Sequence, residues 1–197
     1  MSLKVNICGI EFDNPVIAAS GTFGFGKEFA DYIDINKLGG ISSKGLTLHK
    51  NLGNKGIRIY ETAAGIMNSI GLQNPGIEYF IKEELPFLET KDAVTIANLG
   101  GHSVDEYVKG AILLDKTSVP IIELNISCPN VKEGGMAFGT NPKKACEVIE
   151  KVRKATKKVL MVKLSPNVGD IKEFVKIAEN SGADCISLVN TFNALAI

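Results

Sequence analysis

Short apolar segments rich in strand-forming residues alternate with amphipathic segments along most of this 197-residue chain. The expected strands begin near residues 15, 40, 93, 121, 159 and 185, and most of them are roughly thirty residues apart. Strands that are apolar along their whole length are typical of a parallel sheet that is covered on both faces. The pattern therefore predicts an α/β fold, with helices over about 75–88, 103–114, 143–156 and 170–180.

The remaining segments predict smaller elements. Residues 4–12 alternate around Gly9 and predict a β-hairpin that plugs one end of the core. We expect a short helical segment over 27–33 and two further extended pieces over 57–60 and 64–67. Ser103, followed by acidic residues, has the pattern of a helix N-cap.

Polar residues stand where the predicted strands end. They are Ser20, Lys44, Asn98, Asn125 and Asn190. An open doubly wound sheet would gather its site at one switch point. Convergence from many strands onto one mouth is instead typical of a TIM (β/α)₈ barrel, whose sites lie at the carboxyl ends of the strands. We therefore predict a barrel with one functional mouth.

The chemistry of these side chains indicates a planar ligand. An asparagine amide offers both donors and an acceptor, so several amides with a lysine can recognise a heterocycle such as a pyrimidine or a flavin. Lys163 interrupts an apolar strand, and a buried lysine is costly unless it meets an acceptor or an anion; the alternative is a lysine that reaches solvent from an edge strand. Any single strand-end asparagine is more simply explained as a turn residue.

A glycine-rich loop, residues 21–26, follows the first expected strand. Its glycines lack the order and the acidic partner of a dinucleotide fingerprint. The loop suits either a close approach of the backbone to a flat ligand or a plain turn.

Cys128 lies on a turn just beyond the strand that begins at 121, because Pro129 cannot continue a ladder. A thiol with a reference pKa of about 8.5 can act as a general base with modest help from nearby lysines, and nucleophilic attack is an alternative. The glycine-rich segment after it would let this loop close over a ligand. Cys8, Cys146 and Cys185 are interpreted as small core residues.

Composition excludes several classes of protein. The formal net charge is zero, with both signs interspersed, which argues against a nucleic-acid-binding face. No apolar run approaches the ~20 residues that span a bilayer, and the amino terminus has no signal-peptide pattern. The cysteines are far apart, with no pattern of metal ligands. We expect a cytoplasmic protein with reduced thiols, without a metal, nucleic-acid or membrane site.

Four motifs together resemble the dihydroorotate dehydrogenase family of flavin enzymes from end to end of the chain. They are residues 18–24 (Ala-Ala-Ser-Gly-Thr-Phe-Gly), 68–76 (Asn-Ser-Ile-Gly-Leu-Gln-Asn-Pro-Gly), 125–130 (Asn-Ile-Ser-Cys-Pro-Asn) and 189–191 (Val-Asn-Thr). A cysteine at 128 resembles the soluble class 1 enzymes. Residues 131–135 with Phe138 and Gly139 resemble the type B branch, which uses NAD through a partner subunit carrying FAD and a [2Fe-2S] cluster. The fumarate-dependent type A homodimer is the alternative.

The resemblance implies the roles of particular residues in the oxidation of dihydroorotate to orotate, a step of pyrimidine (UMP) biosynthesis. It implies that FMN contacts Ser20, Lys44, Gly45, Asn98, Asn125, Lys163 and Val189. It implies that dihydroorotate contacts Lys44, Asn68, Ser69, Ile70, Gly71, Leu72, Asn125, Asn190 and Thr191. Cys128 would remove the C5 proton while hydride passes from C6 to flavin N5. The implied assembly is a homodimer of catalytic subunits with an electron-transfer subunit, a heterotetramer.

The chain provides about six barrel strands, whereas a complete barrel needs eight strands and about 250 residues. We therefore expect residues 1–197 to form a single, partial barrel domain that is a truncated chain, a cleaved chain or half of a complementing pair. A non-catalytic fragment that folds only by association stays an alternative, because two open sheet edges would be exposed. A lyase that binds phosphorylated substrates in a barrel is disfavoured, since it would need more cations than asparagines.

Overall fold

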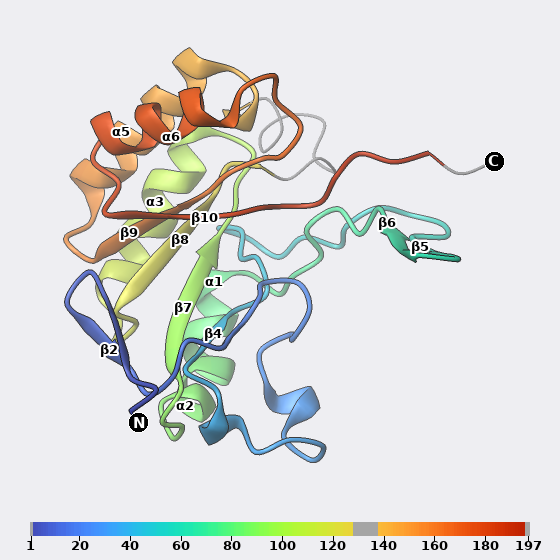
Figure 1. The fold of residues 1–197 in the computed structure, drawn as a ribbon, viewed down its shortest axis with the longest axis vertical. Coiled ribbons are helices and arrows are strands. Elements are labelled where there is room, and N and C mark those ends of the chain that lie inside the picture. The colour runs from blue at the N-terminus through green and yellow to red at the C-terminus, as the bar shows by residue number, and fades with distance from the viewer. Residues whose placement is uncertain (1, 128–137, 196–197) are drawn as a thin grey trace.

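The computed structural model describes residues 2–127 and 138–195 (Figure 1). Its centre is a six-stranded sheet in which every neighbouring pair is parallel. In spatial order the strands are β3 (Ile17–Ala18), β4 (Gly40–Ser42), β7 (Val94–Leu99), β8 (Ile121–Asn125), β9 (Val159–Lys163) and β10 (Cys185–Ser187). Spatial order follows chain order, as it does in the wall of a (β/α) barrel. The predicted fold class, a partial TIM barrel with six strands, is confirmed.

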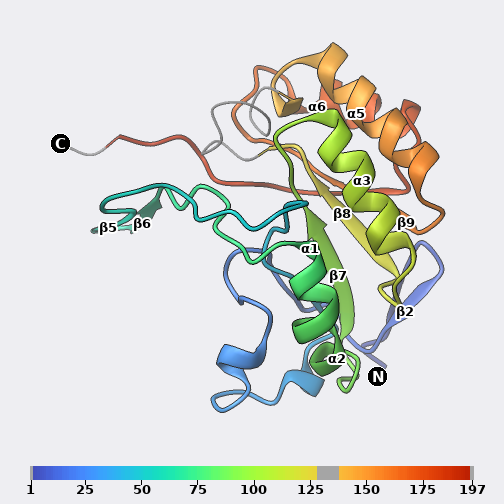
Figure 2. The same ribbon diagram turned by 180° about the vertical axis from the view of Figure 1, so that it is seen from behind.

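Helices cover the outer face of the sheet, as the view from behind shows (Figure 2). The long ones are α3 (Val104–Asp115), α5 (Pro142–Ala155) and α6 (Ile171–Asn180). The predicted helix over 75–88 is a continuous series of α1 (Ile77–Tyr79), the π-helical turn η3 (Phe80–Glu84) and α2 (Leu85–Leu88). Ser103 caps α3 as expected, because its side chain accepts a hydrogen bond from the Glu106 amide at 3.2 Å.

The short helix expected over 27–33 is wrong. The structure has a single 3₁₀ turn there, η1 (Lys27–Phe29), and a second one, η2 (Ile35–Lys37), follows the predicted range. Gly26, with φ 89°, precedes η1 and offers no side-chain cap. A segment this short cannot repay the cost of helix nucleation without an amphipathic face to bury.

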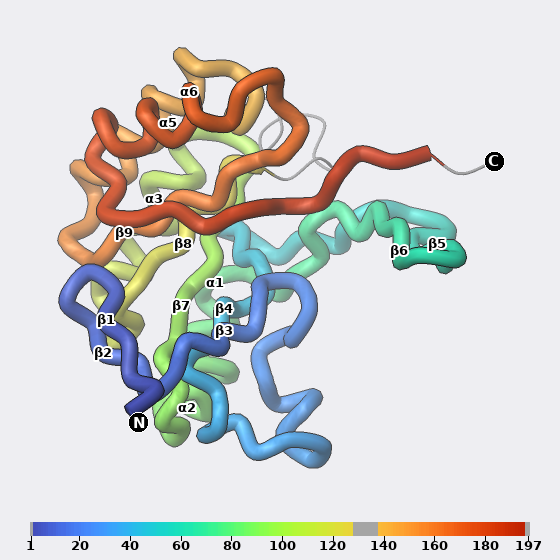
Figure 3. The backbone as a smooth tube through the Cα atoms, in the orientation of Figure 1, coloured from blue at the N-terminus to red at the C-terminus, as the bar shows by residue number. Residues whose placement is uncertain are grey.

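The expected extended pieces near residue 60 form a hairpin of their own. It consists of β5 (Ile59–Thr62) and β6 (Gly65–Asn68), which pair antiparallel and stand apart from the main sheet. Figure 3 shows that this hairpin and the segment after β10 extend to the same side of the molecule. Both lie beyond the carboxyl ends of the parallel strands, where a barrel places its site.

The N-terminal hairpin, β1 (Val5–Ile7) and β2 (Ile10–Phe12), covers the opposite end of the sheet. Phe12 is fully buried against Ile96, Ile121 and Met161, which come from three neighbouring strands. The close approach requires a glycine at position 40, since a Cβ there would lie 2.9 Å from the Phe12 ring. The predicted plug at one end of the core is therefore present.

Cys8 does not belong to the core, contrary to the sequence interpretation. It lies at the turn of the N-terminal hairpin with φ 51°, and it is exposed. A residue in this turn must hold a left-handed backbone, and the Cys8 thiol lies 3.4 Å from the Asp184 carbonyl at the surface. Cys185 is partly buried beside it, and burial raises the pKa of the Cys185 thiol to about 12. Within the described residues, no helix is both long and apolar enough to cross a membrane.

The plug predicts a specific sensitivity of stability. Replacing Phe12 with alanine should lower the free energy of unfolding by about 3–5 kcal/mol, because it leaves a cavity among three strands. Chemical denaturation followed by circular dichroism measures this change. Glu11→Ala on the same hairpin is the control, since its ion pair with Lys4 is exposed to solvent and is expected to contribute little to stability. Equal losses in the two variants would contradict the packing role of Phe12.

Candidate active site

The inward face of the parallel sheet changes character along the strands. Successive inward positions of β8 are Ile121, Glu123 and Asn125, because side chains alternate between the two faces of a strand. The first packs against the N-terminal hairpin, whereas the other two lie at the carboxyl end and are polar. On β7 the same change runs from Ile96 to Asn98. The carboxyl ends of the strands therefore form a polar interior layer.

Glu123 is the centre of this layer and is only 4% exposed. Its two carboxylate oxygens accept hydrogen bonds from Ser42 Oγ, Asn98 Nδ2 and Ser187 Oγ, each at 2.6 Å. Such donors are what a buried carboxylate needs in place of water. Sequence reasoning missed Glu123, although an acidic residue two positions before Asn125 in an apolar strand was a usable signal.

A cavity of about 620 Å³ opens above this layer at the carboxyl ends of the strands. Strand ends, the glycine-rich loop, the β5–β6 hairpin, the loop after it and the segment after β10 all contribute to its wall. The lining residues are Ser20, Gly21, Thr22, Lys44, Gly45, Ile59, Ile66, Asn68, Ile70, Gly71, Leu72, Asn125, Lys163, Asn190 and Thr191. Its size and mixed lining are typical of a site for a small organic molecule.

The apolar part of the wall includes two exposed isoleucines of the hairpin. Ile59 and Ile66 lie on the same face as Asn68, because β5 and β6 pair Ile59 with Asn68 and Glu61 with Ile66. Both remain more than half exposed in the chain by itself. Sequence reasoning did not identify them, since a short exposed hairpin has no periodicity that indicates which face meets a ligand.

The loop that follows the β5–β6 hairpin is held in an unusual backbone conformation. Gly71 and Leu72 follow one another with φ 74° and 54°, and a left-handed leucine is uncommon. The turn brings the Leu72 side chain against Gly45, where a Cβ would meet it at 2.9 Å and Asn98 Oδ1 at 3.0 Å. Gly45 therefore has no room for a side chain.

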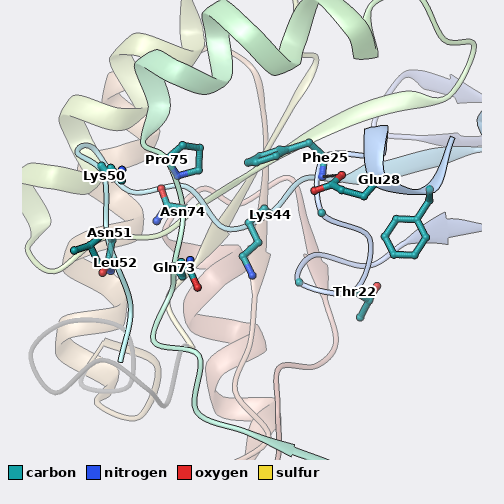
Figure 4. Close-up of a pocket in the computed structure, with 13 residues that line it drawn as sticks. Thr22, Phe25, Glu28, Lys44, Lys50, Asn51, Leu52, Gln73, Asn74 and Pro75 are labelled. Carbon is teal, nitrogen blue, oxygen red and sulfur yellow. Dashed lines mark hydrogen bonds between the residues drawn. The ribbon is translucent and has the colours of Figure 1, made fainter. Parts of the chain in front are cut away.

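Lys44 stands between this cavity and a second one of about 510 Å³, and it lines both. Figure 4 shows it with Phe25 and Glu28 on one side and Gln73 and Asn74 on the other. Burial is the main cause that lowers the pKa of the Lys44 ammonium, and the Arg58 charge lowers it further, while Glu28 opposes the shift. A bound anion would stabilise the charged form of Lys44 against this burial.

The family model described as dihydroorotate dehydrogenase matches residues 2–197. The chain belongs to the dihydroorotate dehydrogenase family. It is 61% identical over 194 residues to the "Dihydroorotate dehydrogenase B (NAD(+)), catalytic subunit" of Petrotoga mobilis, covering 98% of this chain and 65% of that protein.

Relatives with the same name from two other bacteria match this chain over a similar share of its length. The Thermoanaerobacter pseudethanolicus protein is 51% identical over 197 residues, which is 100% of this chain and 65% of that protein. The Bacteroides thetaiotaomicron protein is 52% identical over 196 residues, which is 99% of this chain and 65% of that protein. The chain thus spans about 65% of the length of these relatives. The resemblance to the dihydroorotate dehydrogenase family, and to its type B members, is confirmed.

The structure brings together most residues that the dihydroorotate dehydrogenase resemblance assigns to ligands. Those that line the larger cavity are Ser20, Lys44, Gly45, Asn68, Ile70, Gly71, Leu72, Asn125, Lys163, Asn190 and Thr191. Asn98, Ser69 and Val189 do not line it. Asn98 is fully buried behind Asn125, and the backbone of Ser69 is tied to Arg58 by a 2.8 Å hydrogen bond. Cys128 lies outside the described residues, together with residues 131–135 of the type B motif.

The described residues contain no group of three or more His, Cys, Asp or Glu side chains that could hold a metal. His102 pairs with Glu106 of the first turn of α3, at 3.1 Å from Nδ1 to the carboxylate. Lys163 makes no hydrogen bond or ion pair to any residue that the structure describes, and its ammonium belongs to the lining of the cavity.

The surroundings of Lys44 predict shifts of opposite sign in its pKa. Arg58→Ala should raise it by removing a cation, and Glu28→Gln should lower it by removing an anion. Carbon-13 NMR titration of methylated lysines measures both, with Lys44→Arg to assign the signal. Since the folded pKa lies below the unfolded one, the unfolded chain binds more protons between the two values, so the contribution of Lys44 to stability rises with pH through that window. Shifts of the same sign in both variants would contradict this account.

Proposed function

We propose that this chain provides the ring-binding and proton-removing part of a dihydroorotate dehydrogenase. In this proposal it oxidises dihydroorotate to orotate with FMN, as a step of pyrimidine (UMP) biosynthesis. The observation that carries the proposal is the cavity at the carboxyl ends of the strands, where Asn125, Asn190, Lys44 and Lys163 converge from four different segments.

The cavity suits a flavin ring. Its floor offers amide and ammonium groups that match the alternating N–H and C=O groups of a pyrimidine edge. Gly45 leaves the backbone open to close approach, because a side chain there would strike Leu72 and Asn98. In the proposal Ser20, Lys44, Gly45, Asn125, Lys163 and Val189 hold FMN, with Asn98 behind them. When bound, FMN accepts the hydride from C6 of dihydroorotate at its N5 atom.

The residues around the ring divide the remaining work. Lys44 would bind the substrate carboxylate, since its ammonium is already short of a counter-charge. Asn68 and the loop over 69–72 would hold one side of dihydroorotate, with Asn125, Asn190 and Thr191 on the other. Ile59 and Ile66 would keep water from the stacked rings. Cys128 would take the C5 proton as general base, and its place in the chain supports this role, since Ser127 just before it is buried beside Asn125.

The assembly is proposed from the family resemblance, and the names of the relatives as catalytic subunits support the presence of a partner subunit. As a type B catalytic subunit, the chain would pass electrons to NAD through a partner subunit that carries FAD and a [2Fe-2S] cluster. The proposed complex is a heterotetramer of two catalytic and two electron-transfer subunits, in the cytoplasm. All the relatives reported above are named as NAD-dependent, which supports this branch over a fumarate-dependent type A homodimer.

The flavin proposal predicts the optical behaviour of the purified protein. Loaded with FMN, it should show the visible absorption of an oxidised flavin, and this absorption should bleach when dihydroorotate is added without oxygen. The measurement is an anaerobic absorption titration. A spectrum that does not bleach on addition of dihydroorotate, with flavin demonstrably bound, would contradict the proposed substrate. A protein that retains no flavin after excess FMN has been removed would favour the non-catalytic alternative.

The proposed base predicts a change in rate without loss of cofactor. Cys128→Ser should slow flavin reduction by about 10²–10⁴-fold at neutral pH, since a hydroxyl is a far weaker base, while FMN stays bound. Stopped-flow absorption gives the rate, and flavin content gives the binding. Cys146→Ser is the matched control, because that thiol lies on α5 and interacts with Glu150 and Ser181, away from the cavity. Reduction at the parent rate in Cys128→Ser would refute the assignment.

A further inference from the structure

The buried carboxylate of Glu123 lies one layer below the cavity and takes no part in the proposed chemistry. It does not line the cavity, and its donors come from strands on either side of β8: Ser42 on β4, Asn98 on β7 and Ser187 on β10. A carboxylate that receives three hydrogen bonds acts only as an acceptor. It therefore imposes a direction on whatever donates to it.

A chain of side-chain amides leads from Glu123 to the cavity wall. Asn98 donates its Nδ2 to Glu123 and uses its Oδ1 to accept from Asn125 Nδ2 at 3.1 Å. Asn125 in turn uses its Oδ1 to accept from Asn190 Nδ2 at 3.2 Å and from Ser127 Oγ at 3.2 Å. Every amide in the series points its NH₂ group toward Glu123 and its carbonyl away from it.

The orientation of these asparagine amides is not determined by their shape. The two ends of an asparagine amide are nearly the same size, so each could be turned over without a clash. Only the partners decide the orientation. Because Glu123 offers no hydrogen, the end of Asn98 that faces it must be the NH₂ group, and the Asn98 carbonyl then requires the NH₂ group of Asn125. The backbone N–H groups of Ser127 and Thr191, which can only donate, hold Asn125 and Asn190 in the same orientation.

The direction determines what the cavity offers a ligand. The Asn125 carbonyl is occupied by Asn190 and by the backbone and side chain of Ser127. Both Asn190 amide hydrogens are used as well, on Asn125 and on Ser127 Oγ at 3.0 Å. Within the described residues, the second hydrogen of Asn125 Nδ2 has no partner, and Asn125 lines the cavity, so this residue can offer a donor there. Turned over, the same residue would present an acceptor.

We propose that Glu123 is a positioning residue that fixes the orientation of the Asn98 amide and so, together with the Ser127 backbone N–H, holds Asn125 with a hydrogen-bond donor toward a ligand atom carrying a lone pair. The identity of that atom, a carbonyl oxygen or ring nitrogen of the flavin or the pyrimidine, rests on the proposed function. The polarity itself does not.

The competing explanation is that Glu123 only ties strands together. Its hydrogen bonds do connect β4, β7 and β10 to β8. The two explanations differ in what the carboxylate's replacements should do. A link between strands needs only groups that hold the strands together. The orientation of the amides needs a group that can only accept hydrogen bonds, placed against the Asn98 amide.

Three variants separate the explanations. Glu123→Met fills the space but removes the acceptor, so Asn98 should turn over to accept from Ser42. Its NH₂ group would then oppose that of Asn125 and displace Asn125 from its donor position. Glu123→Gln keeps an oxygen for Asn98, because the Ser187 hydroxyl can turn to accept from the new amide, and polarity should survive. Adding Asn98→Asp to Glu123→Met places the acceptor-only group one link along the chain, so Asn125 should again point its NH₂ group inward.

Two readouts are needed. The first is the side-chain NH₂ signals of Asn125 and Asn190 in ¹⁵N-asparagine-labelled protein without ligand, which report the direction directly. The second is the affinity for FMN, measured by quenching of flavin fluorescence. We expect Glu123→Met to bind FMN about 10- to 100-fold more weakly, the range for loss of one hydrogen bond to a buried ligand group. Glu123→Gln and the double variant should lie near the parent in both readouts.

Ser187→Ala is the control for the tie, since it removes one strand-linking hydrogen bond and leaves the acceptor in place. A loss of FMN affinity in Ser187→Ala as large as in Glu123→Met, or a double variant that recovers neither readout, would overturn the proposal. If Glu123→Met does not fold, the double variant decides: a folded protein with the parent's Asn125 signals supports the proposal, and any other result overturns it. Absence of flavin binding in the parent would refute the proposed function, while the amide signals would still test Glu123.

Discussion

The interior of a curled parallel sheet must be filled by every second residue of its strands, and this requirement organises the whole structure. At the amino ends the requirement is met by apolar packing, where Phe12 from the N-terminal hairpin meets Ile96, Ile121 and Met161. At the carboxyl ends it is met by hydrogen bonds around Glu123. One strand, β8, passes through both regions, so the plug and the candidate site are two ends of the same interior.

The polar end is viable because its groups satisfy one another. Among the described residues, no fully buried side-chain nitrogen or oxygen lacks a hydrogen-bond partner. A half-satisfied network at this depth would cost more than an apolar core, since each unpaired group keeps its full desolvation penalty. The network therefore holds the amides of Asn98 and Asn125 in one orientation before any ligand arrives, which reduces the cost of ordering them on binding.

The sequence predicted the regular parts of the fold because their signals are local. Apolar runs identified β7, β8 and β9, and Ser103 with its following acids identified the start of α3. Prediction failed where the outcome depends on distant neighbours. The segment over 27–33 had helix-forming residues but packs against the core through Phe29 without an amphipathic helical face, and Cys8 looked apolar although it occupies an exposed turn. Glu123 was overlooked because its donors lie far away in the chain, on β4, β7 and β10.

By itself the sequence determined the order of strands and helices, the family, and the set of polar residues at the strand ends, because periodicity and motifs are properties of short stretches. Only the tertiary structure decided which of those residues face the cavity and which stand behind it. Asn98 and Asn125 have similar positions at the ends of adjacent strands, yet one is a buried link and the other lines the wall. The physical reason is that register and curl set the depth of a side chain, and hydrogen bonds between strands set its orientation.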